Sequence, residues 1–524
     1  MIGAASKATL GELFGYLAAR RGDAVALRDP EGRALTYGMF QDRVRKLCAA
    51  VASRGVSKGA RVAVLAKNSV AYAEVFGLVQ LGMVVVPLNW RLGPDALGDL
   101  LADCAPEILI VDRAHYEVIR NHAATLGSLK LTMCFDGPEP GFAGYEAVLN
   151  EDHPPAVPPA VGPDDAASIV YTSGTTGRPK GAVITHRGAL ANMAMSQANL
   201  LQLGEGDRVL AAMPFFHVGG LWYHFFASFA AGCETTVLPE FDPVAVLAAL
   251  RRDRITVVHL VPTMVSALLG HQAFRPEDLR DLRRVFYAGS PMPTSLLRRA
   301  IAALETCEFL QSYGSTEAGI VSALTPAHHA EALRDDGRLL RSCGIPVQGC
   351  EVRIACKDGT SRPGQVGEIE VRGDAVFHGY WQRPDATAEV RAGDWVRTGD
   401  LGYLDAEGFL FLVDRKNDMI ITGGENVFPT EVEDHLMRQD GVAEAAVFGT
   451  PHPRWIEQVT AVIVPVAGHV VDIDSLRESL RRDLAHYKCP KEIFIADGLP
   501  KNGVGKVVRA RLREIYSTLE GGLQ

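Results

Sequence analysis

Apolar and polar positions alternate along the first part of the chain in a way that predicts strands separated by helices. RVAVLA at residues 61–66 and ILIVD at 108–112 are short apolar runs of the kind that form buried strands. Thr36 precedes a stretch with helical spacing. The most apolar run, at residues 75–88, is too short to span a bilayer, and we expect a buried helix leading into a strand. Strands joined by helices favour a parallel, doubly wound sheet.

A second alternation of the same kind follows a connection at residues 136–163, which is rich in Pro, Gly and Glu. Helical spacing begins at His186, and Asp242 with Pro243 predicts an N-cap followed by a first-turn proline. Ligands of such sheets bind at the carboxyl ends of the strands. Three runs that predict strands with small or polar ends are ITVVHL (255–260), RRVFYAG (283–289) and CEFLQSYG (307–314).

The pattern changes after residue 343 to short alternating runs with tight turns. Asp358-Gly359 lies between two of these runs and predicts a hairpin in a small antiparallel barrel or sheet. The C-terminal part has strand and helix patterns of its own, and Thr430 with Glu433 predicts a capping box at a helix start.

These patterns predict an α/β fold with two domains, because 524 residues exceed what a single hydrophobic core usually supports. Residues 418–524 form a small α+β C-terminal domain. The large N-terminal domain, residues 1–414, consists of two doubly wound α/β subdomains, about 1–165 and 166–343, and a small β-barrel-like subdomain at 344–414.

Composition and charge exclude several classes of protein. The net charge of −9, without a long Lys/Arg block, argues against nucleic-acid binding. The nine cysteines are scattered and include no C-x-x-C pair, so we expect a reducing, cytoplasmic location. The first residues lack a charged start followed by an apolar core, so we expect no secretory signal, and we expect no integral membrane segment.

The stretch YTSGTTGRPKG at residues 171–181 has the composition of a phosphate site, with glycines, hydroxyls and the charge of Lys180. A bare Gly/Ser/Thr cluster is more often a surface turn, but a preceding strand and two basic residues accompany this one. The Walker spacing is absent and Pro179 disfavours a helix, so we expect a mobile clasp over a polyphosphate. The candidate ligands are Thr172, Ser173, Gly174, Thr175, Thr176, Gly177 and Lys180.

At these residues the chain resembles the adenylate-forming superfamily, which comprises acyl-CoA synthetases, aryl-CoA ligases, luciferases and the adenylation domains of peptide synthetases. The resemblance extends over nearly the whole length. It implies that the chain uses ATP, Mg²⁺ and CoA. It also implies that residues 418–524 form a mobile lid that rotates on a hinge at residues 415–417.

Residues after the predicted strands match the family pattern. His217 in PFFHVGG corresponds to a histidine beside the acyl carboxylate, although a lone histidine is more often structural. Gly289 and Ser290 in AGSPMP correspond to a segment that faces adenine and the acyl group. Trp222 would fit an ordinary core equally well, and Ser312 replaces a glycine common in the family. We place three residues in the acyl pocket: Trp222, Ala288 and Ser312.

Five further residues take roles that the resemblance implies for ATP. Tyr313 offers a ring for stacking on adenine, and Thr316 offers a hydroxyl to the α-phosphate. Glu317 offers a hard oxygen ligand to Mg²⁺, although a glutamate near a turn is usually only solvated. Asp400, in a T-G-D turn, would bind the ribose hydroxyls, and Arg415 would reach ribose and phosphate.

The C-terminal part supplies the remaining candidates. Lys506, in the ending P-K-x-x-x-G-K, corresponds to the catalytic lysine of the family, although most lysines are merely solvated. Asn417 occupies the hinge position, where the family generally has Asp or Lys. Gly423, Gly424 and Glu425 would line the CoA tunnel once the lid has rotated.

These features predict an ATP-dependent carboxylic acid:CoA ligase. An acid and ATP would give acyl-AMP and pyrophosphate, and acyl-AMP and CoA would then give acyl-CoA and AMP. The apolar pocket favours a medium- or long-chain fatty acid or an aromatic acid as the small-molecule partner. Alternatives left open are an acyl-AMP ligase that loads a carrier protein and an ATP-binding regulatory protein or ATPase without ligase activity. A homodimer is also left open.

Overall fold

The chain divides into two compact units. The computed structural model describes residues 8–172, 179–334, 337–356, 359, 361–416, 418–423, 425–501 and 507–517. The first unit comprises Met1–Val352, Glu370–Thr398 and Gly408–Leu410, and the second comprises Arg353–Ile369, Gly399–Glu407 and Phe411–Gln524. The second unit therefore combines the C-terminal segment with two short stretches from the β-rich region before it.

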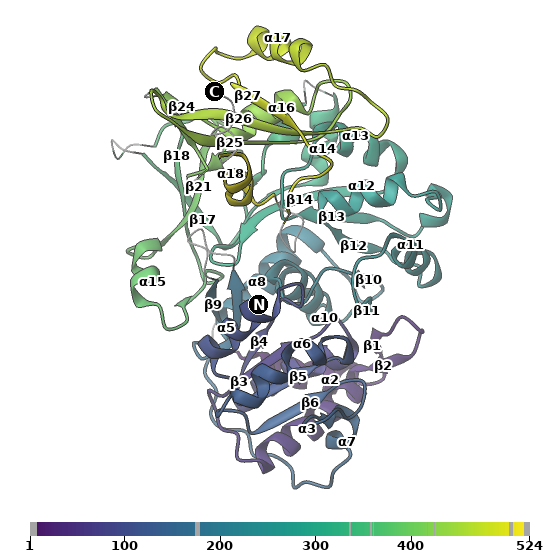
Figure 1. Ribbon diagram of the computed structural model, residues 1–524. Helices are drawn as coiled ribbons and strands as arrows, with labels where there is room; N and C mark the ends of the chain where they lie inside the picture. The colour runs from purple at the N-terminus through teal and green to yellow at the C-terminus, as the bar shows by residue number, and fades with distance from the viewer. Residues whose placement is uncertain are drawn as a thin grey trace. The chain divides into compact units, whose positions relative to one another are not determined.

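The first apolar runs of the sequence form an eight-stranded sheet in the first unit, in which β3, β4, β5 and β6 lie side by side (Figure 1). These strands pair in parallel and are almost wholly buried, whereas β8, β9 and β19 pair antiparallel at one edge. In spatial order the strands are β19 (Gly379–Tyr380), β9 (Lys180–Thr185), β8 (Ala166–Thr172), β4 (Val84–Pro87), β3 (Arg61–Leu65), β5 (Ile108–Val111), β6 (Leu131–Cys134) and β7 (Ala143–Gly144).

A nine-stranded sheet carries the second alternation and also takes up the two N-terminal strands. Its middle is parallel and its two edges are antiparallel. The expected division near residue 165 does not coincide with a change of sheet, because β1 and β2 lie here while β8 and β9 lie in the other sheet. The order is β16 (Ile345–Pro346), β15 (Gly319–Leu324), β14 (Glu308–Ser315), β13 (Arg284–Ala288), β12 (Val257–Leu260), β10 (Arg208–Ala211), β11 (Glu234–Val237), β1 (Val25–Arg28) and β2 (Ala34–Thr36).

Helices connect the strands of both sheets, and two of them begin where the sequence predicts, at Thr36 and at the expected N-cap Asp242. Thr36 Oγ1 accepts a hydrogen bond from Met39 N at 3.2 Å, and Asp242 Oδ1 accepts one from Ala245 N at 2.8 Å. The helices of the first unit are α2 (Leu10–Arg21), α3 (Tyr37–Ser53), α4 (Val70–Val75), α5 (Pro94–Cys104), α6 (Arg113–Thr125), α7 (Tyr145–Leu149), α8 (His186–Ser196), α9 (Val218–Gly220), α10 (Phe226–Ala230), α11 (Pro243–Arg252), α12 (Pro262–Gly270), α13 (Thr294–Ala303), α14 (Pro326–Arg334) and α15 (Pro384–Val390).

The first unit also contains short helical segments that are not α-helical, among them the 3-10 helices η4 (Pro276–Leu279) and η5 (Arg338–Arg341). The run at residues 75–88 forms the buried 3-10 helix η1 (Phe76–Leu81) followed by β4, as the sequence predicts. Two π-helical segments, η2 (Gln197–Leu201) and η3 (Leu221–Phe225), follow α8 and α9. Among the described residues, none of the helices has both the length and the apolar character required to cross a membrane.

Two smaller sheets complete the fold. The runs on either side of Asp358 form the neighbouring strands β17 and β18, which end and begin at Ala355 and Gly367. Asp358, where the sequence predicts the hairpin turn, lies outside the described residues. One sheet has the order β17 (Glu351–Ala355), β18 (Gly367–Arg372), β21 (Trp395–Leu404) and β20 (Arg391–Ala392), with β22 (Leu410–Arg415) paired to β21. The other has the order β24 (Glu425–Val427), β23 (Ile420–Thr422), β26 (Ile456–Pro465) and β25 (Val442–His452), with β27 (Glu492–Ile495) paired to β26. The helices of this region are α16 (Pro429–Leu436), α17 (Ile473–Asp483) and α18 (Arg509–Ser517).

The predicted capping box of Thr430 and Glu433 is wrong. Helix α16 begins at Pro429, and no side chain caps it from the preceding residue. Thr430 N and Oγ1 instead donate to the carboxylate of Asp414, at 2.9 and 3.2 Å. Glu433 accepts from Val447 N at 2.8 Å and from Arg509. Because the proline turn shifts the start of the helix, tertiary partners satisfy the groups that a box would have paired.

His329 in α14 couples the stability of the first unit to pH. Its Nε2 lies 2.9 Å from the Tyr287 hydroxyl and its Nδ1 lies 2.8 Å from the Thr325 carbonyl oxygen. The neutral ring can therefore donate to Thr325 and accept from Tyr287. Burial lowers the pKa of His329 from 6.5 to about 4, so the folded state holds the ring neutral at pH values where an unfolded chain would protonate it.

We expect His329→Gln to make the protein less sensitive to acid. Between pH 6.5 and about 4 the unfolded state binds a proton at His329 that the folded state does not. Through this residue, the free energy of unfolding of the wild type therefore decreases by up to about 1.4 kcal/mol for each pH unit of acidification. The melting temperature, measured from pH 7 to pH 5, should fall less steeply for the variant. The exposed His469→Gln serves as control, and equal slopes for His329→Gln and wild type would contradict the assignment.

Candidate active site

Three strand ends of the first unit meet at the carboxylate of Glu317. This residue lies in the turn between β14 and β15 and is half-buried. Its Oε1 accepts hydrogen bonds from Thr172 Oγ1 at 3.2 Å and from the Tyr380 hydroxyl at 2.9 Å. Thr172 is the last residue of β8, and Tyr380 is the last residue of β19. The structure therefore brings together two predicted ligands, Thr172 and Glu317, and adds a tyrosine.

Tyr380 is a site residue that the sequence reasoning missed. It pairs with Ala182 across β19 and β9, and its ring centroid lies 5.2 Å from the Lys180 ammonium. Burial and the neighbouring charge of Glu317 raise the pKa of Tyr380 well above its usual range. The phenol therefore stays protonated and donates to the carboxylate. The only sequence signal was a tyrosine between a glycine and a tryptophan, far from the phosphate motif.

The strands β13 and β14 place the predicted adenine and acyl residues beside one another. Ala288 pairs with Ser312 at their carboxyl ends. Gly289 has a φ of +91°, and an added Cβ would lie 3.3 Å from Val261 Cγ1, so both backbone conformation and space favour glycine there. Tyr313 is buried, whereas Ser290 and Thr316 are half-buried. These neighbours lie along one edge of the nine-stranded sheet.

The π-helical segment η3 runs next to the β14 end. The Tyr223 hydroxyl donates to the Ser315 carbonyl oxygen at 2.8 Å, which fixes the backbone just before Thr316. Trp222 is buried and packs against Phe76 and Phe226, with ring centroids 5.5 and 5.1 Å away. These apolar contacts suit Trp222 as a core residue and equally as a residue that lines the acyl pocket.

His217 directly precedes helix α9 and is half-buried, with its ring centroid 4.4 Å from that of Phe216. Its backbone carbonyl accepts from Leu221 N at 2.9 Å. The residue thus stands at the start of the segment that leads through α9 into η3, which is where a residue beside the acyl carboxylate is expected.

In the second unit, two predicted nucleotide ligands form an ion pair. Arg415 Nε lies 3.3 Å from the carboxylate of Asp400. Asp400 is buried, while about half of the Arg415 side chain is exposed. Gly423 adopts a φ of +60° next to the β23–β24 pairing of Thr422 with Glu425, and Glu425 is exposed. Gly423 N donates to the Trp455 carbonyl oxygen at 2.9 Å.

Described residues on both sides of Lys506 form specific contacts within the second unit. Lys501 forms an isolated antiparallel bridge with Val507, and its ammonium lies 2.6 Å from the Glu444 carboxylate. Arg509, at the start of α18, donates to Glu433 at 2.7 Å and lies 3.2 Å from Asp418. Lys501, an ordinary lysine by sequence, therefore pairs with Val507, the residue that follows Lys506, and with Glu444.

Several predicted site residues lie outside the part of the chain that the structure describes, so their roles stay predictions. They are Ser173, Gly174, Thr175, Thr176 and Gly177 in the phosphate motif, Asn417 at the hinge, Gly424 in the GGEN stretch, and Lys506.

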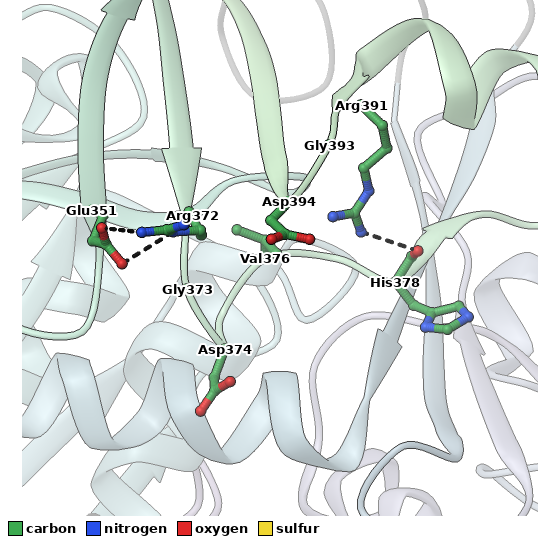
Figure 2. Close-up of a pocket in the computed structure, with 9 residues that line it drawn as sticks. All are labelled: Glu351, Arg372, Gly373, Asp374, Val376, His378, Arg391, Gly393 and Asp394. Atoms are coloured by element: carbon green, nitrogen blue, oxygen red, sulfur yellow. Dashed lines mark hydrogen bonds and ion pairs between the residues drawn. The ribbon is translucent and has the colours of Figure 1, made fainter.

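A cavity of about 620 Å³ in the first unit involves none of the predicted residues (Figure 2). Arg372 pairs with Glu351 across it, and Arg391 donates to the His378 carbonyl oxygen at 3.2 Å. Asp374 and Asp394 also line it. None of the predicted site residues lines this cavity, so it is not the candidate active site.

Comparisons with known proteins agree with this geometry. Residues 15–381 match the model of the AMP-binding enzyme family, and residues 431–506 match that of the AMP-binding enzyme C-terminal domain. The chain is 40% identical over 491 residues to a feruloyl-CoA synthase from Amycolatopsis sp, covering 93% of this chain and 94% of the relative. It is 38% identical over 496 residues to an indoleacetate–CoA ligase from Aromatoleum aromaticum, covering 94% and 95%.

Comparison with solved structures points to the same family of enzymes. The crystal structure of ATP-bound MatB from Rhodopseudomonas palustris matches with a TM-score of 0.88 at 30% identity, over 97% of this chain and 99% of that one. The predicted α/β fold, with a large N-terminal and a small C-terminal domain, is thereby confirmed. The chain therefore belongs to the AMP-binding enzymes, the adenylate-forming superfamily, and to its CoA-ligase branch.

Proposed function

We propose that this chain is an ATP-dependent carboxylic acid:CoA ligase that joins an aromatic or fatty acid to CoA through an acyl-AMP intermediate. The observation that carries the proposal is the convergence on Glu317, where Thr172 of the phosphate motif and Tyr380 both donate to one carboxylate. The relatives named for feruloyl-CoA and indoleacetate support an aromatic acid.

Glu317 fits a magnesium ion that arrives with ATP. Mg²⁺ prefers oxygen ligands and is usually held by one or two carboxylates together with substrate phosphates. Among the described residues, no group of three or more His, Cys, Asp or Glu side chains could hold a metal without substrate. The single carboxylate of Glu317 with the Thr172 hydroxyl beside it suits this shared kind of site. Mg²⁺ bound there would neutralise charge on the phosphates.

Two anions must approach each other in the first step. An oxygen of the acid carboxylate attacks the α-phosphorus of ATP, and the bond from that phosphorus to pyrophosphate breaks. Lys180, beside the Tyr380 ring, would hold the leaving pyrophosphate. Thr316 would donate to the α-phosphate, and Tyr313 would stack on adenine. Lys506 would bridge the carboxylate and α-phosphate oxygens as charge develops between them.

The second step requires Lys506 to withdraw so that the thiol of CoA can reach the adenylate. We propose that the lid rotates about Asn417 and that Gly423, Gly424 and Glu425 then line the pantetheine path. Arg415 and Asp400, already paired at 3.3 Å, would hold the nucleotide during this motion. Lid motions of this kind limit the rate of many enzymes.

We also propose that the enzyme acts in the cytoplasm. Nine cysteines without a C-x-x-C pair suit a reducing compartment. A homodimer is not required for the chemistry, because the proposed ligands of ATP, the acid and CoA all come from one chain.

The nucleotide product tests the proposed reaction. We expect AMP and pyrophosphate from the full chain with ATP, Mg²⁺, CoA and one of a panel of aromatic and fatty acids, and no AMP when the acid is omitted. A chain that releases ADP and phosphate, with or without an acid, would contradict the ligase reaction and support an ATPase.

We expect Lys506→Ala to lower the rate of adenylation by about 10² to 10³, because it removes one preorganised donor from the developing charge. Pyrophosphate exchange into ATP, driven by the acid, measures this step without CoA. Lys488→Ala, which removes an ion pair with Glu431 in the same unit, serves as control and should remain near wild type. Near wild-type exchange in Lys506→Ala would refute its role.

We expect Tyr380→Phe to slow adenylation by about tenfold and to raise the Mg²⁺ concentration required for half-maximal rate. The variant keeps the ring beside Lys180 but removes a hydrogen bond to a charged group, which is typically worth about 1.5–3 kcal/mol. Tyr16→Phe, at an exposed position of the same unit, is the matched control. An unchanged Mg²⁺ requirement in Tyr380→Phe would show that the phenol does not position Glu317.

A further inference from the structure

Two histidines lie against each other inside the first unit and take no part in the proposed chemistry. His224 belongs to the π-helical segment η3, and His259 belongs to β12. Their ring centroids are 5.4 Å apart, and the two residues are only 1% and 2% exposed. They are thus a buried polar pair.

The ring nitrogens of this pair lack satisfactory partners. Nε2 of His224 and both nitrogens of His259 make no hydrogen bond to any residue of the described chain. The backbone of Gly219 faces His259 and weakly opposes the lowering of its pKa, but it does not meet the geometry of a hydrogen bond. An unpaired buried polar group costs about 1–3 kcal/mol, so such groups usually have a partner when the protein works.

A purely structural role explains only part of this arrangement. His259 stacks on Phe286 with ring centroids 4.3 Å apart, which accounts for its packing but leaves its nitrogens unexplained. His329 shows how a structural histidine is satisfied in this protein, because both of its nitrogens have partners within 2.9 Å. The pair differs from His329 in this respect.

The register of the sheet places His259 below the predicted acyl pocket. His259 pairs with Phe286, and two residues further along β13 Ala288 pairs with Ser312. Residues two apart in a strand share a face, and paired residues of neighbouring strands do too, so all four side chains lie on the same side of the sheet. His259 therefore lies about 6–7 Å deeper than Ala288 and Ser312, measured along the strands.

His259 also lies next to the segment that follows His217. Gly219 is half-buried, and an added Cβ there would meet a single heavy atom within 4 Å, His259 Cε1 at 3.6 Å. The same π-helical segment that carries His224 also carries Tyr223, whose hydroxyl donates to Ser315 next to Thr316. Such π-helical segments are frequent at functional sites. One short segment thus joins the histidine pair to the reacting end of the site.

The pair is electrically neutral. Burial lowers the pKa of His224 from 6.5 to about 3, and burial together with His224 lowers the pKa of His259 well below its usual range. A neutral imidazole offers one donor and one acceptor. It can therefore pair with a hydroxyl or a ring N–H of the acid substrate. It provides no positive charge to offset the burial of a second carboxylate on that substrate.

We propose that His224 and His259 form the polar end of the acyl pocket, and that the acid is an aromatic one with a hydroxyl or ring N–H at the end opposite its carboxylate. This inference rests on the proposed ligase function and narrows it. The apolar ring would lie against Phe286 and the small residues Ala288 and Ser312, with its polar end toward the two histidines. The pair determines specificity and does not touch the reacting atoms.

Two acids that differ by one hydroxyl test this proposal. The probes are 4-hydroxycinnamate and cinnamate, with octanoate as an unrelated acid, and the readout is kcat/KM for CoA-dependent AMP release. We expect the wild type to favour 4-hydroxycinnamate over cinnamate by about 10- to 100-fold, because cinnamate leaves the buried nitrogens unpaired. A wild-type ratio near one would overturn the proposal without any variant.

Variants then assign the preference to the pair. His259→Leu and His224→Leu should each lower the ratio by about tenfold, through a loss with 4-hydroxycinnamate while activity with cinnamate is retained. His259→Gln, which keeps a neutral donor and acceptor, should retain more of the preference and serves where His259→Leu does not fold. His329→Gln is the control with an unchanged ratio. A wild-type ratio preserved in both leucine variants would overturn the proposal.

These outcomes are distinct from a failure of the ligase function. If no acid, including octanoate, gives AMP, the proposed reaction itself is wrong. If octanoate and cinnamate give AMP as efficiently as 4-hydroxycinnamate, the reaction stands and the role of the histidine pair falls.

Discussion

The arrangement of the first unit depends on the turn that carries Glu317. Its side chain accepts from Thr172 and Tyr380, both in the eight-stranded sheet, while Glu317 itself follows β14 of the nine-stranded sheet. Its backbone carbonyl also accepts from Phe377 N at 3.0 Å. Side chain and backbone of one residue therefore join the two sheets, and charge-assisted bonds make this junction stronger than neutral ones would. A displacement of either sheet would move the carboxylate on which a nucleotide would be positioned.

The second unit contains a different stabilising feature, a cluster of half-buried ions near the start of α18. Arg509 lies between Glu433 and Asp418, and it also donates to the Val447 carbonyl oxygen at 3.0 Å. A buried ion pair adds little net stability, but removing one partner leaves an uncompensated charge and is costly. The cluster therefore fixes α18 to α16 through Glu433, to β25 through Val447 and to Asp418.

Local sequence patterns predicted local structure well, but they did not predict pairing between residues far apart in the chain. The helix start at Thr36, the N-cap Asp242 and the helix-to-strand run at 75–88 are formed as expected, because each depends on neighbours in sequence. Tyr380 was missed because its role arises from pairing with β9, about two hundred residues earlier in the chain. The predicted capping box does not form for the same reason, because Thr430 N donates to the carboxylate of Asp414 in β22. The histidine pair has no sequence signature, because His224 and His259 meet only through packing.

The pairing of β1 with β11 has a consequence for how the chain is made. Strands β3 to β9 of the eight-stranded sheet are all encoded between Arg61 and Thr185, so most of that sheet can assemble while translation continues. The hairpin of β1 and β2 leaves the ribosome before the other strands of its sheet, yet the partner of β1 ends only at Val237. During synthesis β1 therefore has an unpaired edge until its partner β11 is made some two hundred residues later.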